Sequence, residues 1–134
     1  MPDLDHIGFT GTKEGMTDNQ KKLFEEELLK YNSKSTAFHH GDCIGADEQA
    51  HNIATKLGFY TIIHPPINDK YRAFCKGNVI LPPLEYLDRN HDIVDSSKKM
   101  FATPKEEIEQ IRSGTWATIR YSKKKKVPVT IINP

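Results

Sequence analysis

Short apolar runs alternate with amphipathic stretches along most of the chain. The strand-like runs cover 6–9, 35–39, 59–64, 98–102 and 127–132. Stretches with apolar positions at helical spacing cover 17–31, 45–57, 84–94 and 114–124, and a short helix is expected over 105–111. Residues 68–83 hold turn residues and two prolines without a steady period, which predicts a loop flanking a functional site.

This alternation predicts the fold class. Strands that alternate with helices are joined by right-handed crossovers and form a parallel sheet covered on both faces. We therefore expect a Rossmann-like α/β fold, with a mostly parallel five-stranded sheet and helices on both faces. A chain of 134 residues is long enough for one domain spanning 1–134, because a domain near this size buries roughly 68% of its unfolded surface.

Three glycine-bearing segments lie where a strand-like run is expected to turn into a helix, at 8–12, 40–47 and 113–116. Such a junction brings backbone N–H groups and the positive end of a helix dipole to one place, which suits a phosphate. In a parallel sheet all three segments fall beyond the carboxyl ends of the strands, where ligands bind. The three segments together predict a nucleotide pocket.

The first segment surrounds its glycines with hydrogen-bond donors. Hydroxyl and ammonium groups beside flexible backbone are what phosphate binding requires. An ordinary tight turn between a strand and a helix is the alternative. The residues concerned are Gly8, Thr10, Gly11, Thr12, Lys13 and Thr17.

The second segment combines two glycines with two carboxylates. Gly41 and Gly45 permit a close approach of the backbone to a ligand, and Asp42 or Asp47 is a candidate acceptor for ribose hydroxyls. Asp47 has an alternative role as a first-turn carboxylate stabilised by the helix dipole.

The third segment has small residues and hydroxyls at a helix start. Ser113, Gly114 and Thr115 fit a phosphate, with Arg120 one turn further along. Trp116 either stacks on a base or packs in the core. Elsewhere, Arg89 beside Asn90 is either a phosphate clamp or an exposed surface arginine.

Charge and composition narrow the classes of partner. The 19 Lys and Arg nearly balance the 18 Asp and Glu, so no global field favours nonspecific nucleic-acid binding. The two cysteines lack metal spacing, and the adjacent histidines 39 and 40 point to opposite faces of a strand, so we expect neither a metal nor a cofactor. Without a signal peptide or an apolar run of roughly 20 residues, the expectation is a cytoplasmic protein with no membrane partner.

The glycine segments, with 15–17, 89–90, 93–95 and 120–121, resemble the SLOG superfamily. This superfamily is named for the Smf/DNA-processing proteins and the LOG nucleotide hydrolases, and the likeness is strongest to its short stand-alone members in bacteria and phages. The resemblance runs nearly end to end. It implies a Rossmann-like sheet that binds nucleotides or nucleotide-derived signals, often in homo-oligomers. It assigns ligand binding to Gly8, Thr10, Gly11, Thr12, Gly41, Asp42, Gly45, Asp47, Arg89, Asn90, Ser113, Gly114 and Thr115.

One position departs from the enzymes of that superfamily. LOG phosphoribohydrolases carry Gly-Gly-x-Gly-Thr-x-x-Glu with a catalytic glutamate, and Thr118 stands at the equivalent position here. A threonine does not act as a general base near neutral pH. Enzymatic activity therefore depends on another carboxylate, for which Asp42, Asp47 and Glu85 are the candidates.

Three functional hypotheses follow. Binding of a nucleotide or nucleotide-derived signal leads. The first alternative is hydrolysis of an N-glycosidic bond in a nucleoside monophosphate or an NAD-like compound. The second is single-stranded DNA binding through Lys13, Arg72, Arg89 and the lysine run 123–126, which the near-neutral charge disfavours.

Overall fold

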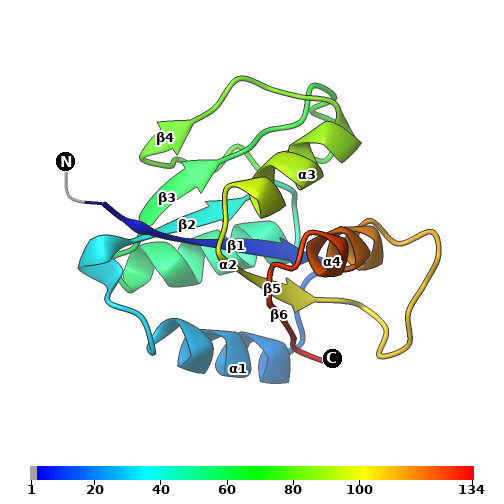
Figure 1. Ribbon diagram of the computed structural model, residues 1–134, viewed down its shortest axis with the longest axis horizontal. Coiled ribbons are helices and arrows are strands. Elements are labelled where there is room, and N and C mark those ends of the chain that lie inside the picture. Colours follow the sequence, from blue (N-terminus) through cyan, green and yellow to red (C-terminus); the bar gives the residue numbers. More distant parts are fainter. Residues whose placement is uncertain (1–2) are drawn as a thin grey trace.

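A computed structural model describes residues 3–134 and contains one parallel sheet of six strands in the order β4-β3-β2-β1-β5-β6 (Figure 1). Every neighbouring pair of strands runs parallel. The strands are β1 (Asp5–Gly11), β2 (Thr36–His40), β3 (Tyr60–Ile63), β4 (Val79–Ile80), β5 (Lys99–Thr103) and β6 (Val129–Ile131). The Rossmann-like α/β prediction is confirmed.

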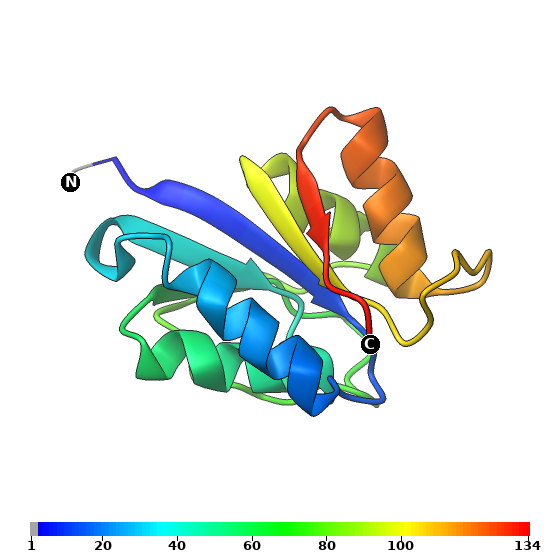
Figure 2. The ribbon, with the colours of Figure 1, turned by 90° about the horizontal axis from the view of Figure 1, so that it is seen from below.

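Helices cover both faces of the sheet. One face carries α1 (Asp18–Leu28) and α2 (Ala46–Lys56), and the other carries α3 (Tyr86–Asp95) and α4 (Gly114–Lys124) (Figures 1 and 2). A short 3-10 turn, η1 (Ser33–Ser35), leads into β2. Because the strand side chains alternate between the faces, Ile7 and Phe9 pack toward α1 and α2, whereas Gly8 faces α3.

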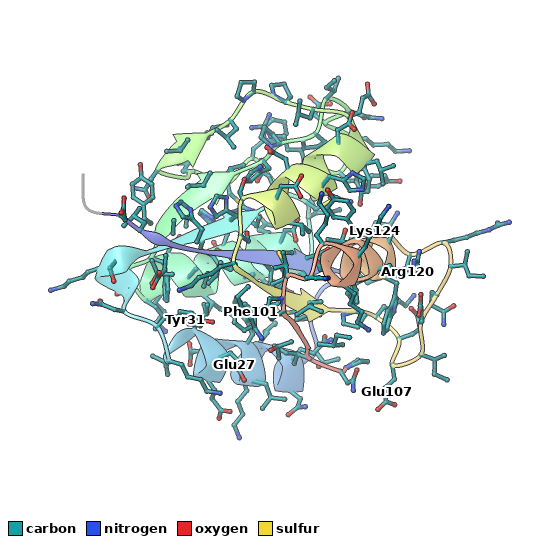
Figure 3. The ribbon with its side chains drawn as sticks, viewed as in Figure 1. Glu27, Tyr31, Phe101, Glu107, Arg120 and Lys124 are labelled. Atoms are coloured by element: carbon teal, nitrogen blue, oxygen red, sulfur yellow. The ribbon has the colours of Figure 1, made fainter. Side chains whose placement is uncertain are left out.

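Aromatic side chains dominate the core under α1 and α2. The Phe9 ring lies 5.0 Å from that of Phe24, and Phe24 lies 5.8 Å from Phe38. Tyr31, just after α1, meets Phe101 of β5 edge to face at 6.1 Å, and Figure 3 labels both residues. Full burial of one such side chain contributes about 1.5–3 kcal/mol to the stability of the folded state. These packed rings therefore stabilise the sheet that supports the site.

The sheet has six strands, so the prediction of five was wrong. The additional strand β4 lies inside the segment that the sequence indicates as a loop, and it pairs with β3 through Ile62 and Ile63. Asn78 holds it in place by accepting from the Thr61 backbone N–H at 2.9 Å. Two residues are too few to display a period of two, which is why the pattern gave no strand there.

The short helix expected over 105–111 does not form. This segment consists of bends and a turn. Arg120 on α4 ties it down, because its guanidinium donates to Glu109 at 2.7 Å and to the Ile111 carbonyl at 3.3 Å. The resulting loop projects beside α4 at the end of the sheet (Figure 1).

No helix in residues 3–134 is long and apolar enough to cross a bilayer.

Candidate functional site

A cavity of about 530 Å³ opens at the carboxyl edge of the sheet. Its volume falls in the range of small-molecule sites, roughly 300–1,000 Å³. The lining comes from the β1–α1 turn, the start of α2, the first turns of α3, the loop after β5 and the start of α4. The residues are Thr10, Gly11, Thr12, Lys13, Glu14, Cys43, Asp47, Tyr86, Arg89, Asn90, Lys105, Glu106, Gln110, Arg112, Ser113, Gly114 and Thr115.

Two of the glycine segments pack tightly against each other beneath this cavity. The Thr12 carbonyl accepts from the backbone N–H of Ala46 at 3.0 Å. Gly45 has a φ of 85°, and a Cβ there would lie 2.2 Å from the Lys13 carbonyl oxygen. Gly45 therefore allows two backbone segments to meet, which aligns the β1–α1 turn with the start of α2.

Arg89 lies at the floor of the cavity and is 2% exposed. Its Nε donates to Asn90 Oδ1 at 2.7 Å, and its Nη1 donates to the carbonyls of Gly41 and His64. Within residues 3–134 no carboxylate lies within ion-pair distance of it. A buried cation whose hydrogen bonds all go to neutral partners attracts an anion, because its charge has lost water without forming an ion pair. The alternative of an exposed surface arginine was wrong.

Asp47 is the buried carboxyl group of the cavity. Its Oδ2 accepts from the Cys43 backbone N–H at 3.2 Å, and its Oδ1 has no hydrogen-bond partner in the described part of the chain. Burial raises the pKa of Asp47 to about 6, although the positive charge of Arg89 acts in the opposite direction. A carboxyl that titrates near neutral pH inside a cavity is typical of functional sites.

The start of α4 presents backbone donors to the same space. Ser113 caps the helix, with its Oγ accepting from the Trp116 N–H at 3.2 Å. The Ala117 N–H binds the Ser113 carbonyl at 2.9 Å. The N–H groups of Gly114 and Thr115 have no intrahelical partner, as at any helix start, so this end of α4 offers an anion site.

A smaller cavity of about 230 Å³ adjoins the larger one. The two share Cys43 and Tyr86. The remaining lining residues of the smaller cavity are Pro66, Asn68, Tyr71 and Glu85, which places the candidate carboxylate Glu85 here and not in the larger cavity.

Several predicted ligand-binding residues have structural roles outside the larger cavity. A Cβ on Gly8 would meet Met100 in the middle of the sheet, and one on Gly41 would lie 2.6 Å from Arg89 Nη1. Thr17 forms a capping box with Gln20, each side chain accepting from the other's backbone N–H at 3.0 Å. Trp116 packs against Ala102 and Ile119, so it is a core residue and does not line the cavity. Arg120 anchors the loop after β5, as described above.

Asp42 also serves the structure. It is fully buried, and its Oδ2 accepts from Arg72 Nε at 2.7 Å while its Oδ1 accepts from the Cys75 N–H at 2.9 Å. The Ala73 N–H binds the Asp42 carbonyl at 2.7 Å. These bonds clasp the segment that follows β3, so neither oxygen of Asp42 is available to a ligand.

The sequence did not indicate the cavity residues that come from loops. Lys105, Glu106 and Gln110 line the cavity from 105–111, where a short helix was expected, and Arg112 lines it from the position just after. Cys43 and Tyr86 were likewise not predicted as ligand-binding. The sequence feature that could have indicated them is the position of these loops beyond the carboxyl ends of strands, where ligands bind in parallel sheets.

A cluster of His40, His51 and Cys75 is the one group in residues 3–134 whose side chains satisfy metal-ligand distances, with ligand atoms within 4.8 Å of one another. Its hydrogen bonds oppose metal binding. The Asp42 N–H donates to His40 Nδ1 at 3.0 Å, so the proton of the neutral ring lies on Nε2, which donates to His51 Nδ1 at 2.9 Å. Metal-bound histidines have the reverse arrangement, with the second nitrogen donating.

On the opposite face of the sheet, three histidines form a hydrogen-bonded chain. His64 Nδ1 lies 3.1 Å from Asp92 Oδ2, and because a carboxylate only accepts, His64 donates there. His39 Nδ1 then donates to His64 Nε2 at 2.8 Å, and His6 Nδ1 donates to His39 Nε2 at 2.8 Å. These hydrogen bonds run from His6 to Asp92. The backbone carbonyl of His64, one member of the chain, also accepts from Arg89 Nη1.

Comparison with known proteins gives fold-level likeness. No protein-family model matches the chain, and no curated protein matches its sequence. Among solved structures, the molybdenum cofactor binding protein of Rippkaea orientalis has a TM-score of 0.75 at 21% identity, covering 100% of this chain and 79% of that one. The molybdenum cofactor carrier protein of Chlamydomonas reinhardtii has a TM-score of 0.71 at 20% identity, covering 98% and 78%.

A third neighbour is DNA processing protein A of Helicobacter pylori, a protein that binds single-stranded DNA. Its TM-score is 0.70 at 17% identity, covering 96% of this chain and 65% of that one. At these identities the likeness concerns the fold. The chain shares the Rossmann-like α/β fold of these neighbours, as the resemblance to the SLOG superfamily implies.

Proposed function

We propose that the protein binds a nucleotide or a nucleotide-derived ligand, with its phosphate in the larger cavity. The observation that carries this proposal is Arg89, a buried cation with no carboxylate partner in residues 3–134, at the floor of a cavity that the start of α4 also lines. A phosphate supplies the missing counter-charge and accepts from helix N–H groups at the same time.

The charges around the cavity support an anionic ligand. Four cations, Lys13, Arg89, Lys105 and Arg112, line it against the carboxylates of Glu14, Asp47 and Glu106. Burial raises the pKa of Asp47 to about 6, so its negative charge is partly neutralised near that pH. The structural neighbours include binders of a molybdenum cofactor and of single-stranded DNA, which supports ligand binding in general.

The Arg112→Glu substitution is expected to weaken nucleotide binding on the order of tenfold, because it places a negative charge beside the phosphate. Arg112 is exposed and forms no ion pair in the described structure, so folding is preserved. Isothermal titration with nucleoside monophosphates and ADP-ribose measures the change. Lys22→Glu, a charge reversal on the exposed side of α1, is the matched control and leaves the affinity unchanged.

Two results would count against the proposal. If no nucleotide binds the wild-type protein, the phosphate site is wrong. If only a single-stranded oligonucleotide binds, with an affinity that falls steeply as salt rises, the protein is a DNA binder instead.

A second candidate function, hydrolysis of an N-glycosidic bond, is supported by the carboxyl group of Asp47. A carboxyl with a pKa raised to about 6 takes up and releases a proton near neutral pH, which a general base requires. As general base, Asp47 would take a proton from the water that attacks C1′ of the ribose. The C1′–N bond would break, and the nucleobase would leave with a proton while ribose 5-phosphate forms. Asp47 provides the carboxylate that Thr118, whose hydroxyl donates to the Gly114 carbonyl at 2.9 Å, does not.

The Asp47→Asn substitution separates binding from hydrolysis. If the protein is a hydrolase, chromatography of a nucleotide incubated with wild-type protein shows free base, and the variant loses turnover by on the order of a hundredfold or more, as for a general base. The variant retains binding, because the amide replaces the carboxyl with little change in shape. Unchanged nucleotide after incubation with wild-type protein would exclude the hydrolase and leave binding intact.

A further inference from the structure

The smaller cavity has two tyrosine walls. Tyr71 and Tyr86 line it together with Pro66, and both tyrosines are about half exposed, at 42% and 52%. Tyr71 is held in place because its carbonyl accepts from the Ile44 N–H at 2.8 Å. Aromatic side chains that line a solvent-open cavity offer stacking surfaces for a flat ring. Here a bound ring shares the tyrosines with cations, since Lys70 lies 5.2 Å from the centre of the Tyr71 ring and the Arg89 guanidinium 4.7 Å from that of Tyr86.

The two cavities are positioned to hold two ends of one molecule. Cys43 and Tyr86 line both of them. Lys13 lines the larger cavity, and its ammonium lies 4.4 Å from the centre of the Tyr71 ring in the smaller one. A phosphate in the larger cavity therefore lies next to an aromatic space, which is the arrangement that a nucleotide needs.

Asn68 and Glu85 contribute an amide and a carboxylate to the lining of the smaller cavity. Their backbones run side by side, because the Ile67 N–H donates to the Leu84 carbonyl at 3.0 Å and the Leu84 N–H donates to the Pro65 carbonyl at 3.2 Å. Asn68 Oδ1 already accepts from the Lys70 N–H at 3.1 Å, which leaves the Asn68 amide N–H groups as donors. Glu85 begins α3 without capping it, so its carboxylate is available as an acceptor.

A donor beside a carboxylate matches one kind of heterocycle edge. Guanine presents a carbonyl oxygen next to two N–H donors, and a carboxylate accepts both of these together. Adenine presents a single amino donor next to a ring nitrogen acceptor, whose lone pair a carboxylate repels. We infer that the smaller cavity binds the 2-amino-4-oxo edge shared by guanine and pterin rings, with Asn68 donating to the carbonyl and Glu85 accepting from the N–H groups.

This inference rests on the proposed phosphate site, and calorimetry separates the two. The ligands are GMP, AMP, ribose 5-phosphate and neopterin phosphate. GMP is expected to bind at least tenfold more tightly than AMP, since a matched bidentate pair discriminates by on the order of tenfold or more. Neopterin phosphate carries the same edge, so its affinity relative to that of GMP shows whether the site prefers a pterin or a guanine ring.

Three variants assign the residues. Glu85→Gln is expected to remove the preference for GMP over AMP, because an amide offers one acceptor and adds a donor. Tyr71→Ala weakens GMP and AMP alike by on the order of tenfold, through loss of stacking, and weakens ribose 5-phosphate less, through the Lys13 ammonium that contacts the Tyr71 ring. Glu107→Gln is the matched control: Glu107, labelled in Figure 3, lies on the loop after β5 and outside both cavity linings.

Three other sets of results would overturn the inference. Equal affinities for GMP, AMP and ribose 5-phosphate would show that the smaller cavity holds no ring, while the phosphate site stands. Tighter binding of AMP, or a GMP preference that survives in Glu85→Gln, would remove Asn68 and Glu85 from recognition. Failure of all four ligands to bind would overturn the phosphate site and the ring site together.

Discussion

Lowering the pH from about 7.5 to about 5 is expected to reduce the free energy of unfolding by at least about 1 kcal/mol. Buried histidines are the cause. Burial, with the neighbouring His64 and His6, lowers the pKa of His39 to about 3, and burial holds the pKa of His40 well below its ordinary value of 6.5. The pKa values of His51 and His64 are also lowered, chiefly by burial.

The sign follows from where the protons bind. At about pH 7.5, well above the ordinary histidine pKa of 6.5, these buried imidazoles are neutral in both the folded and the unfolded chain and contribute little to the pH dependence. Below that pKa the unfolded chain takes up a proton that folded His39 does not bind, which costs about 2 kcal/mol at about pH 5, and the lowered pKa of His40 acts in the same direction. Asp47, with its pKa raised to about 6, binds its proton more tightly in the folded state and offsets about 1 kcal/mol.

Urea unfolding at the two pH values measures this change. The His39→Gln variant removes one of the two strongest contributors, so its stability is expected to depend on pH about 2 kcal/mol less than that of the wild type. Equal stability of the wild-type protein at both pH values would contradict the buried neutral state of the histidine chain.

Most of the fold could be predicted from the sequence, because its elements carry strong local signals. The helix after Thr17 has a capping-box sequence, which forms as expected. Phe24 and Leu28 of its apolar stripe are buried, whereas Leu23 and Leu29 are exposed and the helix ends at Leu28. The strand at β4 could not be predicted, since its two residues depend on tertiary contacts such as the Asn78–Thr61 bond. The loop at 105–111 has a helical composition, but ion pairing with α4 decides its conformation.

The candidate site was harder to predict than the fold. Glycines were interpreted as places where a ligand approaches the backbone, yet Gly41 and Gly45 accommodate Arg89 and the Lys13 carbonyl instead. The sequence pattern is the same in both cases, because a glycine permits the close approach of a ligand and of another part of the protein equally well. Tyr71, Tyr86 and Asn68 carry no motif at all, and only the tertiary arrangement of the loops brings them together.

The Gly45→Ala substitution is expected to destabilise the protein by about 3 kcal/mol or more, since backbone strain and overpacking act at one position. Gly45 has a φ of 85°, and its added Cβ would lie 2.2 Å from the Lys13 carbonyl, a backbone atom that moves only if the whole turn shifts. Gly58→Ala is the control. Gly58 has a similar φ of 90°, but its Cβ would meet only Ser33 Oγ at 3.4 Å, so we expect a loss of about 1–2 kcal/mol from strain alone.

Denaturant unfolding of the two variants therefore separates conformational strain from steric exclusion, because the φ values match and the contacts differ. Equal losses would mean that the approach of Lys13 to the start of α2 is not a tight constraint. A larger loss at Gly45, accompanied by weaker nucleotide binding in protein that is still folded, would show that the packing of the two glycine segments sets the geometry of the cavity above them. The glycines would then act on the ligand indirectly, by positioning Lys13 and Asp47, and this distinguishes a glycine that supports a site from one that touches its ligand.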